Sequence, residues 1–426
     1  MIKRLLPMTV AATLFSALPA LAQGLPTAKP EEVGFSSERL QRISDALRRD
    51  VEKGQIPGAT LLIGRHGKVA YLETFGSLDP ETRAPMTKDA IFRIYSMTKP
   101  ITSVAAMMLV EEGKLSLSDP VAKHLPEFKD VKVGIEKPGP DGKPVLEEVP
   151  PRRAMTIQDL LRHTSGLTYG VFGDSLVKQA YRERGVLEGD FDNAELSARL
   201  AKMPLMFPPG SSWEYSHATD VLGRVVEVVS GQTLGEFQKA RILEPLGMKD
   251  TSFYVTDAAK HARVAEPFKT DRNIGAGVDM FDPRVQRRYE SGGGGLVATV
   301  GDYARFAQML LNGGVLDGKR LLSPATVTYM TSDHLGAIPT GAAYLPGDGY
   351  GFGLGFAVRK ADGISPQFGT KGEYNWGGAG GTYYWADPKN GMFVVLGMQS
   401  PKQRLHYRAV LRSMVYGALV SEDGER

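Results

Sequence analysis

The sequence contains no cysteine, so it can form neither a disulfide nor a thiolate metal site, and a cysteine nucleophile is excluded. Its seven histidines are scattered, with neither a His-Glu-x-x-His motif nor a close pair, which argues against a zinc hydrolase. We therefore expect no metal and no organic cofactor.

A strong charge of one sign is also absent. The 51 Lys and Arg residues nearly balance the 48 Asp and Glu residues, for a formal net charge of +3. A nucleic acid is therefore not the expected partner. The 42% hydrophobic and 23% charged composition is typical of a globular enzyme. No segment beyond the N-terminus reaches about 18 uninterrupted apolar residues, the length of a membrane span.

The N-terminus has the three parts of a secretory signal peptide. Basic Lys3-Arg4 precedes an apolar run over residues 5–17, and Ala20-Leu21-Ala22 places small residues at the −3 and −1 positions of a cleavage site. The pattern predicts a signal peptide over residues 1–22, a periplasmic or secreted hydrolase domain over 23–426, and no stable membrane insertion after cleavage. A retained membrane anchor is the alternative. Cleavage after Ala22 lowers the net charge to +1.

Strand patterns lie at both ends of the chain, with helical patterns between them. Near the N-terminus, Ser36 or Ser37 can cap a helix that ends near Gly54, and a hairpin follows over 59–63 and 69–75. Further segments have the composition of strands (351–358, 382–386 and 392–398) or of helices (101–112, 157–162, 221–229, 302–311 and 405–419).

This order predicts an α/β (α+β) fold, in which N- and C-terminal strands form an antiparallel sheet flanked by helices. A mostly helical lobe is expected over roughly 110–290. The Gly- and Pro-rich segments 131–151 and 335–349 are predicted to be surface loops, and loops of that length often frame a binding cleft.

The strongest chemical motif is a Ser-x-x-Lys sequence, Ser96-Met97-Thr98-Lys99, at the start of an apolar helix. This spacing places the amine one turn from the hydroxyl, and the helix N-terminus favours negative charge beside the serine. Ser96 could instead serve only as a helix cap. A second copy, Ser175 to Lys178, overlaps a Gly-Asp-Ser-Leu motif of another esterase family, but the Asp-x-x-His that this family needs is missing.

Two later segments complete a set of three. Trp213-Glu214-Tyr215-Ser216-His217 precedes a helical pattern, and Trp376-Gly377-Gly378-Ala379 lies in a glycine-rich strand region near the C-terminus. Together with Ser-x-x-Lys, these segments resemble the serine β-lactamase and penicillin-binding superfamily, class C-like, and within it the family VIII carboxylesterases most closely. The resemblance covers roughly residues 31–420 and implies a β-lactamase-like fold.

The resemblance also implies roles for individual residues. Ser96 matches the nucleophile, Lys99 the motif lysine, and Tyr215 the tyrosine that acts as general base or relays the proton. The backbone N–H groups of Ser96 and Ala379 match the oxyanion hole.

Substrate-binding positions follow in the same way at Trp376, Gly377, Gly378 and His217. His217 stands where the superfamily usually has Asn, so holding the loop or capping the next helix are further interpretations of it. Thr370-Lys371-Gly372 is an alternative lysine motif, although its residue order is wrong.

Other segments have structural interpretations. His163, within 160–167, is expected to be a buried hydrogen-bonding residue, and the glycines of 291–296 to permit tight packing, since no P-loop lysine follows them. Gly-x-Ser-x-Gly is absent, and strands do not alternate with helices, so an α/β-hydrolase is not expected.

The predicted function is an exported serine hydrolase that cleaves small-molecule carboxylic esters through a Ser96 acyl-enzyme. An aromatic Trp376 in place of a strand lysine favours uncharged esters over β-lactams, which carry a carboxylate. The alternatives are a β-lactamase or D,D-peptidase-type amide hydrolase, an amidase or transacylase of the same fold, and a non-catalytic penicillin-binding-like protein.

Overall fold

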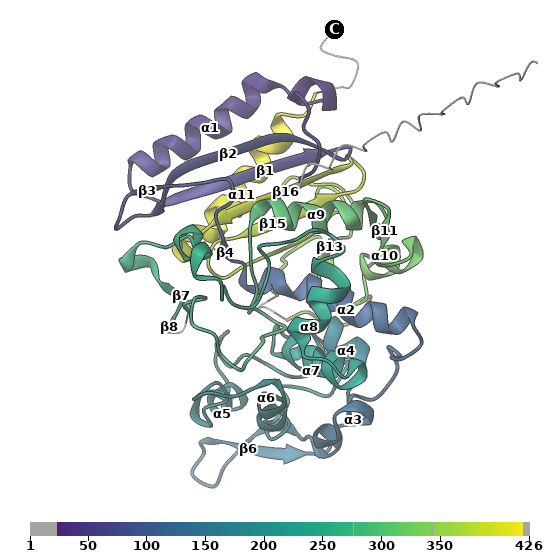
Figure 1. Cartoon of the computed structure of the whole chain (residues 1–426). Helices are drawn as coiled ribbons and strands as arrows, with labels where there is room; N and C mark the ends of the chain where they lie inside the picture. Colours follow the sequence, from purple (N-terminus) through teal and green to yellow (C-terminus); the bar gives the residue numbers. More distant parts are fainter. Residues whose placement is uncertain (1–23, 276, 342–343, 421–426) are drawn as a thin grey trace, which may run out of the picture.

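The computed structural model describes residues 24–275, 277–341 and 344–420, so the predicted signal peptide lies outside the described residues. Figure 1 shows a large sheet with helices on both faces, and below it a mostly helical lobe. The fold is the expected α/β arrangement.

The sheet has eight strands, and each neighbouring pair is antiparallel. Their order is β12 (Tyr350–Phe352), β13 (Ala357–Arg359), β14 (Tyr374–Gly377), β15 (Tyr383–Asp387), β16 (Met392–Met398), β1 (Gly58–Arg65), β2 (Lys68–Asp79) and β3 (Ala84–Pro85). Because β1 pairs with β16, Leu61 lies opposite Leu396. The prediction that both ends of the chain build one sheet is confirmed.

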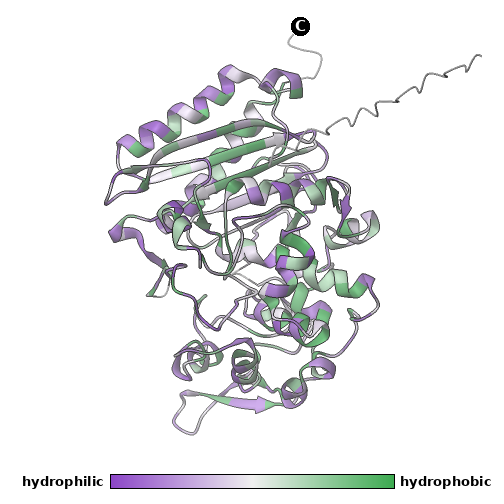
Figure 2. Ribbon diagram, in the orientation of Figure 1, coloured by the Kyte–Doolittle hydropathy of each residue, from purple (hydrophilic) through white to green (hydrophobic). Residues whose placement is uncertain are grey.

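Alternating side chains of the central strands supply two separate cores. Leu61 and Ile63 of β1 pack with helices α1 (Ser37–Glu52) and α11 (Arg404–Gly417) on the outer face. Leu62 points to the opposite face, into the core shared with α2 (Thr98–Glu111) and α9 (Val300–Leu311). In Figure 2, α1 is mostly hydrophilic while hydrophobic stretches run along the strands beneath it.

The N-terminal elements form for local reasons that the sequence shows. Ser36 caps α1 by accepting a hydrogen bond from the N–H of Arg39 at 3.3 Å. His66 and Gly67 join β1 to β2 with φ angles of 50° and 78°, as a type I′ hairpin turn requires. Both elements were predicted.

The lobe contains helices but also a hairpin, which corrects the prediction of a loop over 131–151. Its elements are α3 (Val121–His124), β5 (Val133–Pro138), β6 (Pro144–Val149), α4 (Ile157–Leu161), α5 (Leu176–Glu183), α6 (Asn193–Leu200), α7 (Ala218–Ser230) and α8 (Leu234–Gln238). Strands β5 and β6 pair from Val133 opposite Val149 to the tip. Most of their side chains are exposed or half-exposed, so no buried apolar face marked them as strands.

The segment 351–358 is not one strand, as predicted, but the inner part of the short antiparallel pair β12 and β13, in which Gly351 lies opposite Val358. The chain reverses over Gly353 to Phe356, where Gly355 has a φ of 99°, in the left-handed region that glycine favours. The described part of 335–349 contains no helix or strand, as expected for a loop.

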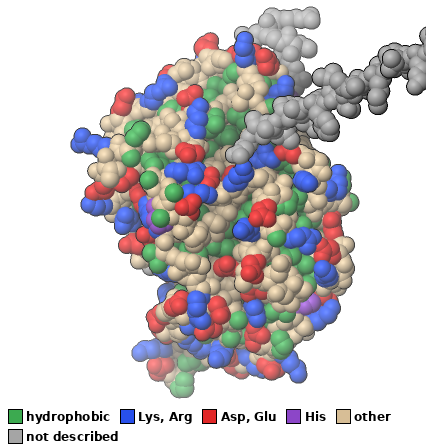
Figure 3. All heavy atoms as spheres, in the orientation of Figure 1, with side chains coloured by type: hydrophobic (Ala, Val, Ile, Leu, Met, Phe, Trp, Pro, Cys, Tyr) green, Lys and Arg blue, Asp and Glu red, His purple; other side chains and the backbone are tan. Residues whose placement is uncertain are grey.

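The remaining elements are short. They are β4 (Phe92–Arg93), β7 (Asn273–Gly275), β8 (Val278–Asp279), β9 (Val297–Ala298), β10 (Val315–Leu316), β11 (Lys319–Arg320), α10 (Pro324–Met330) and several single turns. On the face shown in Figure 3, basic and acidic side chains are interspersed. Among the described residues, no helix is long and apolar enough to cross a bilayer.

Candidate active site

Ser96 lies in a tight turn between β4 and α2. The turn, Tyr95–Met97, is a single 3-10 turn, and Tyr95 has a φ of 44°, which is uncommon for a residue with a side chain. Every other residue from Ile91 to Pro100 is buried, whereas Ser96 is half-exposed. The fold therefore leaves this one hydroxyl of the segment accessible, on a backbone held in a sparsely populated conformation.

Lys99 is fully buried in the first turn of α2, and its ammonium group has three oxygen partners. The Nζ atom lies 3.3 Å from Ser96 Oγ, 2.9 Å from the Tyr169 hydroxyl and 2.6 Å from the Gly293 carbonyl oxygen. A charged amine can donate to all three. A neutral amine can donate to Tyr169 and Gly293 and accept the proton of Ser96 through its lone pair. The same geometry therefore accommodates Lys99 both before and after it takes the Ser96 proton.

Tyr215 lies just before α7, and its ring packs against the Lys99 amine. Its hydroxyl oxygen accepts a 3.0 Å hydrogen bond from the indole Nε1 of Trp376, and the Lys99 Nζ lies 4.6 Å from its ring centroid. The structure thus brings together the predicted residues Ser96, Lys99, Tyr215 and Trp376, which come from separate parts of the sequence.

The glycines after Trp376 allow the β14–β15 turn to pack against the backbone just before Ser96. A Cβ at Gly378 would lie 2.5 Å from the Ile94 carbonyl oxygen, which accepts a hydrogen bond from Thr382 Oγ1. Within the described residues, the N–H of Ala379 makes no hydrogen bond. The turn therefore holds an unused backbone donor next to the serine segment.

His217 is buried and belongs to a network centred on Asp220, a residue that the sequence analysis did not select. Its Nδ1 lies 2.9 Å from Asp220 Oδ2, and its ring contacts Tyr169 with a centroid separation of 4.4 Å. His217 occupies the N-cap position of α7 without capping it through its side chain. Its predicted substrate contact stays a prediction.

Asp220 connects this network to Lys99 through the glycine run. Its Oδ1 accepts hydrogen bonds from Tyr289, Ser291 and the N–H of Gly293, whose carbonyl oxygen contacts Lys99. Burial alone would raise the pKa of Asp220. This effect of burial is outweighed by the hydrogen bond with His217, the charges of His217 and Lys99, and the hydrogen bond from Ser291. The pKa of Asp220 therefore lies well below its usual value. The carboxylate stays charged at neutral pH.

Tyr169 is a second functional candidate that sequence reasoning missed, although it follows the 160–167 segment closely. Burial, together with the neighbouring Tyr215 and Asp220, raises its pKa well above 10. It is therefore a neutral phenol at physiological pH, in contact with Lys99.

Two structural interpretations are confirmed. His163 is buried, with Nδ1 3.1 Å from Ser216 Oγ, and burial lowers its pKa well below 6.5. The glycine run packs closely, since a Cβ at Gly292 would lie 2.7 Å from the Thr219 carbonyl oxygen.

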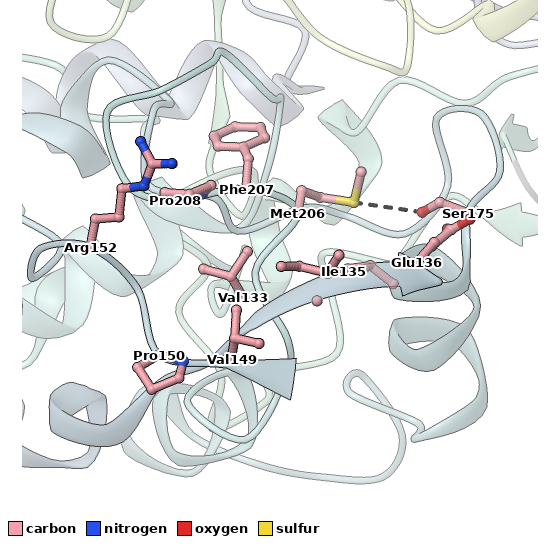
Figure 4. Close-up of a pocket in the computed structure, with 12 residues that line it drawn as sticks. Val133, Ile135, Glu136, Val149, Pro150, Arg152, Ser175, Met206, Phe207 and Pro208 are labelled. Atoms are coloured by element: carbon pink, nitrogen blue, oxygen red, sulfur yellow. Dashed lines mark hydrogen bonds between the residues drawn. The ribbon is translucent and has the colours of Figure 1, made fainter. Parts of the chain in front are cut away.

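The alternative nucleophile and the alternative lysine motif lie elsewhere. Ser175 Oγ caps α5 by accepting from the N–H of Lys178 at 3.1 Å, and it lines an apolar cavity of about 460 Å³ between the β5–β6 hairpin and the segment containing Phe207 (Figure 4). Lys178 forms an ion pair with Glu214. Lys371 is exposed. Over the described ranges, no group of three or more His, Cys, Asp or Glu side chains could hold a metal ion.

Comparison with known proteins agrees with this geometry. The family described as Beta-lactamase matches residues 43–412. Esterase EstB of Burkholderia gladioli is 32% identical over 391 residues, covering 87% of this chain and 92% of EstB. The lovastatin esterase of Penicillium rubens is 31% identical, with 82% and 90% covered. The solved structure of EstCE1, a hydrolase with promiscuous acyltransferase activity, superposes with a TM-score of 0.75 at 29% identity and covers 89% of this chain and 98% of its own.

Proposed function

Because the chain belongs to the beta-lactamase family, we propose that it is a serine esterase that forms an acyl-enzyme on Ser96. One observation carries the proposal: the accessible Ser96 hydroxyl lies 3.3 Å from a buried lysine amine that has two further oxygen partners. An accessible hydroxyl beside an amine that can take its proton is the arrangement that activates a serine nucleophile.

In the first step, the Lys99 and Tyr215 pair removes the Ser96 proton, and the serine oxygen attacks the ester carbonyl. The Tyr215 oxygen accepts a hydrogen bond from the Trp376 N–H, and the Lys99 Nζ lies 4.6 Å from the centroid of the Tyr215 ring. Among the described residues, Lys99 alone donates to the Tyr169 hydroxyl, and burial raises the pKa of Tyr169, so this phenol stays protonated. Tyr215 rather than Tyr169 is therefore the group that passes the proton to the leaving alcohol.

The oxyanion of the tetrahedral intermediate binds between the N–H groups of Ser96 and Ala379. This assignment is supported by the free N–H of Ala379 and by the packing of its turn against Ile94. Water then hydrolyses the acyl-enzyme by the same proton transfers in reverse.

The substrate we propose is an uncharged ester with an apolar acyl or alcohol group. Aromatic rings surround Tyr215: Trp376 at 5.3 Å and Trp213 at 6.1 Å between centroids, with Phe352 packed edge-on against Trp376. Two relatives are named as esterases, which agrees with this substrate class. Amide hydrolysis of a β-lactam is the alternative that a cephalosporin assay tests.

Transfer of the acyl group to an alcohol is a second candidate, favoured by the similarity to EstCE1, which is described as having promiscuous acyltransferase activity. It needs only that an alcohol replaces water in deacylation. Product analysis with an added alcohol would detect the transferred ester.

We also propose export, with cleavage after Ala22. The proposal rests on the basic start, the apolar run and the small residues of the N-terminal sequence.

The experiment that tests the acyl-enzyme is intact-mass measurement after treatment with a fluorophosphonate. The wild type should gain one adduct at Ser96, and Ser96→Ala should lose both the adduct and ester turnover. Ser175→Ala is the matched control and should behave as the wild type. An adduct on Ser175 would overturn the assignment.

A further inference from the structure

The turn between β14 and β15, which bears Ala379 and which we call the oxyanion turn, is held in place by a residue of the C-terminal helix α11. Arg408 in α11 donates a hydrogen bond from Nη2 to the Gly378 carbonyl oxygen at 2.9 Å. That oxygen and the N–H of Ala379 belong to one planar peptide unit. Whatever fixes the carbonyl therefore also fixes the direction in which the N–H points.

The peptide unit is clamped from two sides. On one side, the Ile94 carbonyl lies so close to Gly378 that no Cβ would fit. On the other, a Cβ at Gly377 would lie 2.4 Å from Arg408 Cζ, so the guanidinium occupies the space that a side chain would fill. Each glycine of the Trp-Gly-Gly sequence is therefore required by a different neighbour. Gly378 leaves room for the backbone just before Ser96, and Gly377 leaves room for the guanidinium of Arg408.

The charge of Arg408 is not neutralised by a carboxylate. Among the ion pairs of the described residues none includes Arg408, and its buried Nε has no hydrogen-bond partner there. Arg412, one turn further along α11, is instead paired with Glu373 at 2.6 Å. Burial lowers the pKa of Arg408 to about 10, which leaves it charged at neutral pH.

A positive donor on a peptide oxygen polarises the whole amide and makes its N–H a stronger donor. We propose that Arg408 is a positioning residue of the oxyanion hole, which aims and polarises the Ala379 N–H through the Gly378 carbonyl. This inference rests on the proposed function, because it requires that Ala379 stabilises an oxyanion formed at Ser96.

The test compares Arg408→Met and Arg408→Lys with Arg404→Met. Arg404 is the matched control because it lies one turn earlier on α11 and also donates to a backbone carbonyl, that of Pro401 at 2.7 Å. Two quantities are measured: kcat/KM for p-nitrophenyl acetate, and Ki for phenylboronic acid, whose adduct with Ser96 places a negative oxygen in the hole. Thermal melting checks that each variant is folded.

Removing an oxyanion donor outright costs about 10²–10³ in kcat, so losing the group that aims it should cost roughly 10–100-fold. For Arg408→Met, kcat/KM should fall by this factor, and phenylboronic acid should bind more weakly by a similar factor. Arg408→Lys should lie between Arg408→Met and the wild type, and Arg404→Met should stay within about twofold of the wild type.

A kcat/KM for Arg408→Met equal to that of Arg404→Met would overturn the inference, as would lost turnover with unchanged boronate affinity. If Arg408→Met does not fold, the inference is tested instead by the kcat/KM and the boronate Ki of Arg408→Lys, each compared with the wild type. A wild type that takes no fluorophosphonate on Ser96 would instead refute the proposed function, so the two failures are distinguishable.

Discussion

Replacing Tyr215 with Phe separates the proposed catalytic role of the phenol from its structural role. The variant keeps the ring and its packing but removes the hydroxyl that accepts from Trp376 Nε1. General acid–base catalysis contributes about 10²–10⁴-fold, so kcat for an alkyl ester should fall by that factor. The loss should be smaller for esters of acidic phenols, since their leaving groups need little protonation.

The same change leaves the Trp376 N–H buried without a partner. An unsatisfied buried donor costs about 1–3 kcal/mol, so the free energy of unfolding should fall by that amount in urea titrations. The double variant with Trp376→Phe removes the orphaned donor as well. It should therefore lose less stability than the two single changes combined, while its activity stays low.

Parallel kinetics on His217→Asn provide the comparison that could refute this reasoning. The Nδ1 of His217 is already hydrogen-bonded to Asp220, so the His217→Asn variant should retain more activity than the Tyr215→Phe variant. A nearly unimpaired Tyr215→Phe beside an inactive His217→Asn would make the imidazole the base and contradict the proton path through Tyr215.

Four further outcomes are expected. Ser175→Ala should keep full turnover but lose about 1 kcal/mol of unfolding free energy with its helix cap, and a loss of turnover would contradict the Ser96 assignment. Asp220→Asn should lower kcat by about tenfold, because four hydrogen bonds lose their charge and one of them holds Gly293 beneath Lys99. Burial raises the pKa of Asp302 to about 6, so the folded state binds a proton more tightly than the unfolded state does. As the pH rises from about 4 to 7, the wild type should therefore lose up to about 3 kcal/mol of unfolding free energy relative to Asp302→Asn. Parallel plots of unfolding free energy against pH for the two proteins would refute this. Mass spectrometry of exported protein should find a chain beginning at Gln23, and an uncleaved chain would refute export by this signal.

The sequence predicted the parts of the site that depend on local spacing. Ser96 and Lys99 are three residues apart at a helix start, so their contact follows from helix geometry alone. The β1–β2 hairpin follows in the same way from two turn residues. The turn that bears Ala379 was selected through resemblance, and the structure adds the reason for the glycines at positions 377 and 378.

The parts that were missed depend on contacts between distant segments. Tyr169 contacts Lys99 directly and Asp220 is connected to it through Gly293, both only in the folded chain. Arg408 contacts the Gly378 carbonyl from α11, 30 residues further along the sequence. A buried aspartate or an arginine on an amphipathic helix has no local pattern that separates it from a structural residue. The split of 351–358 was missed because a glycine with positive φ interrupts an otherwise continuous strand pattern.

Because β1 pairs with β16, the central sheet can be completed only after the C-terminal part of the chain has been made. The edge of β1 that faces β16 stays open until the ribosome has made residues 392–398, and at about 5–20 residues per second this takes on the order of tens of seconds. Until then β1 has no partner along that edge, and an unpaired hydrophobic strand edge is prone to aggregation. The turn that bears Ala379 is translated only shortly before β16. A half-made chain therefore already has Ser96 and Lys99 but lacks the turn that bears Ala379.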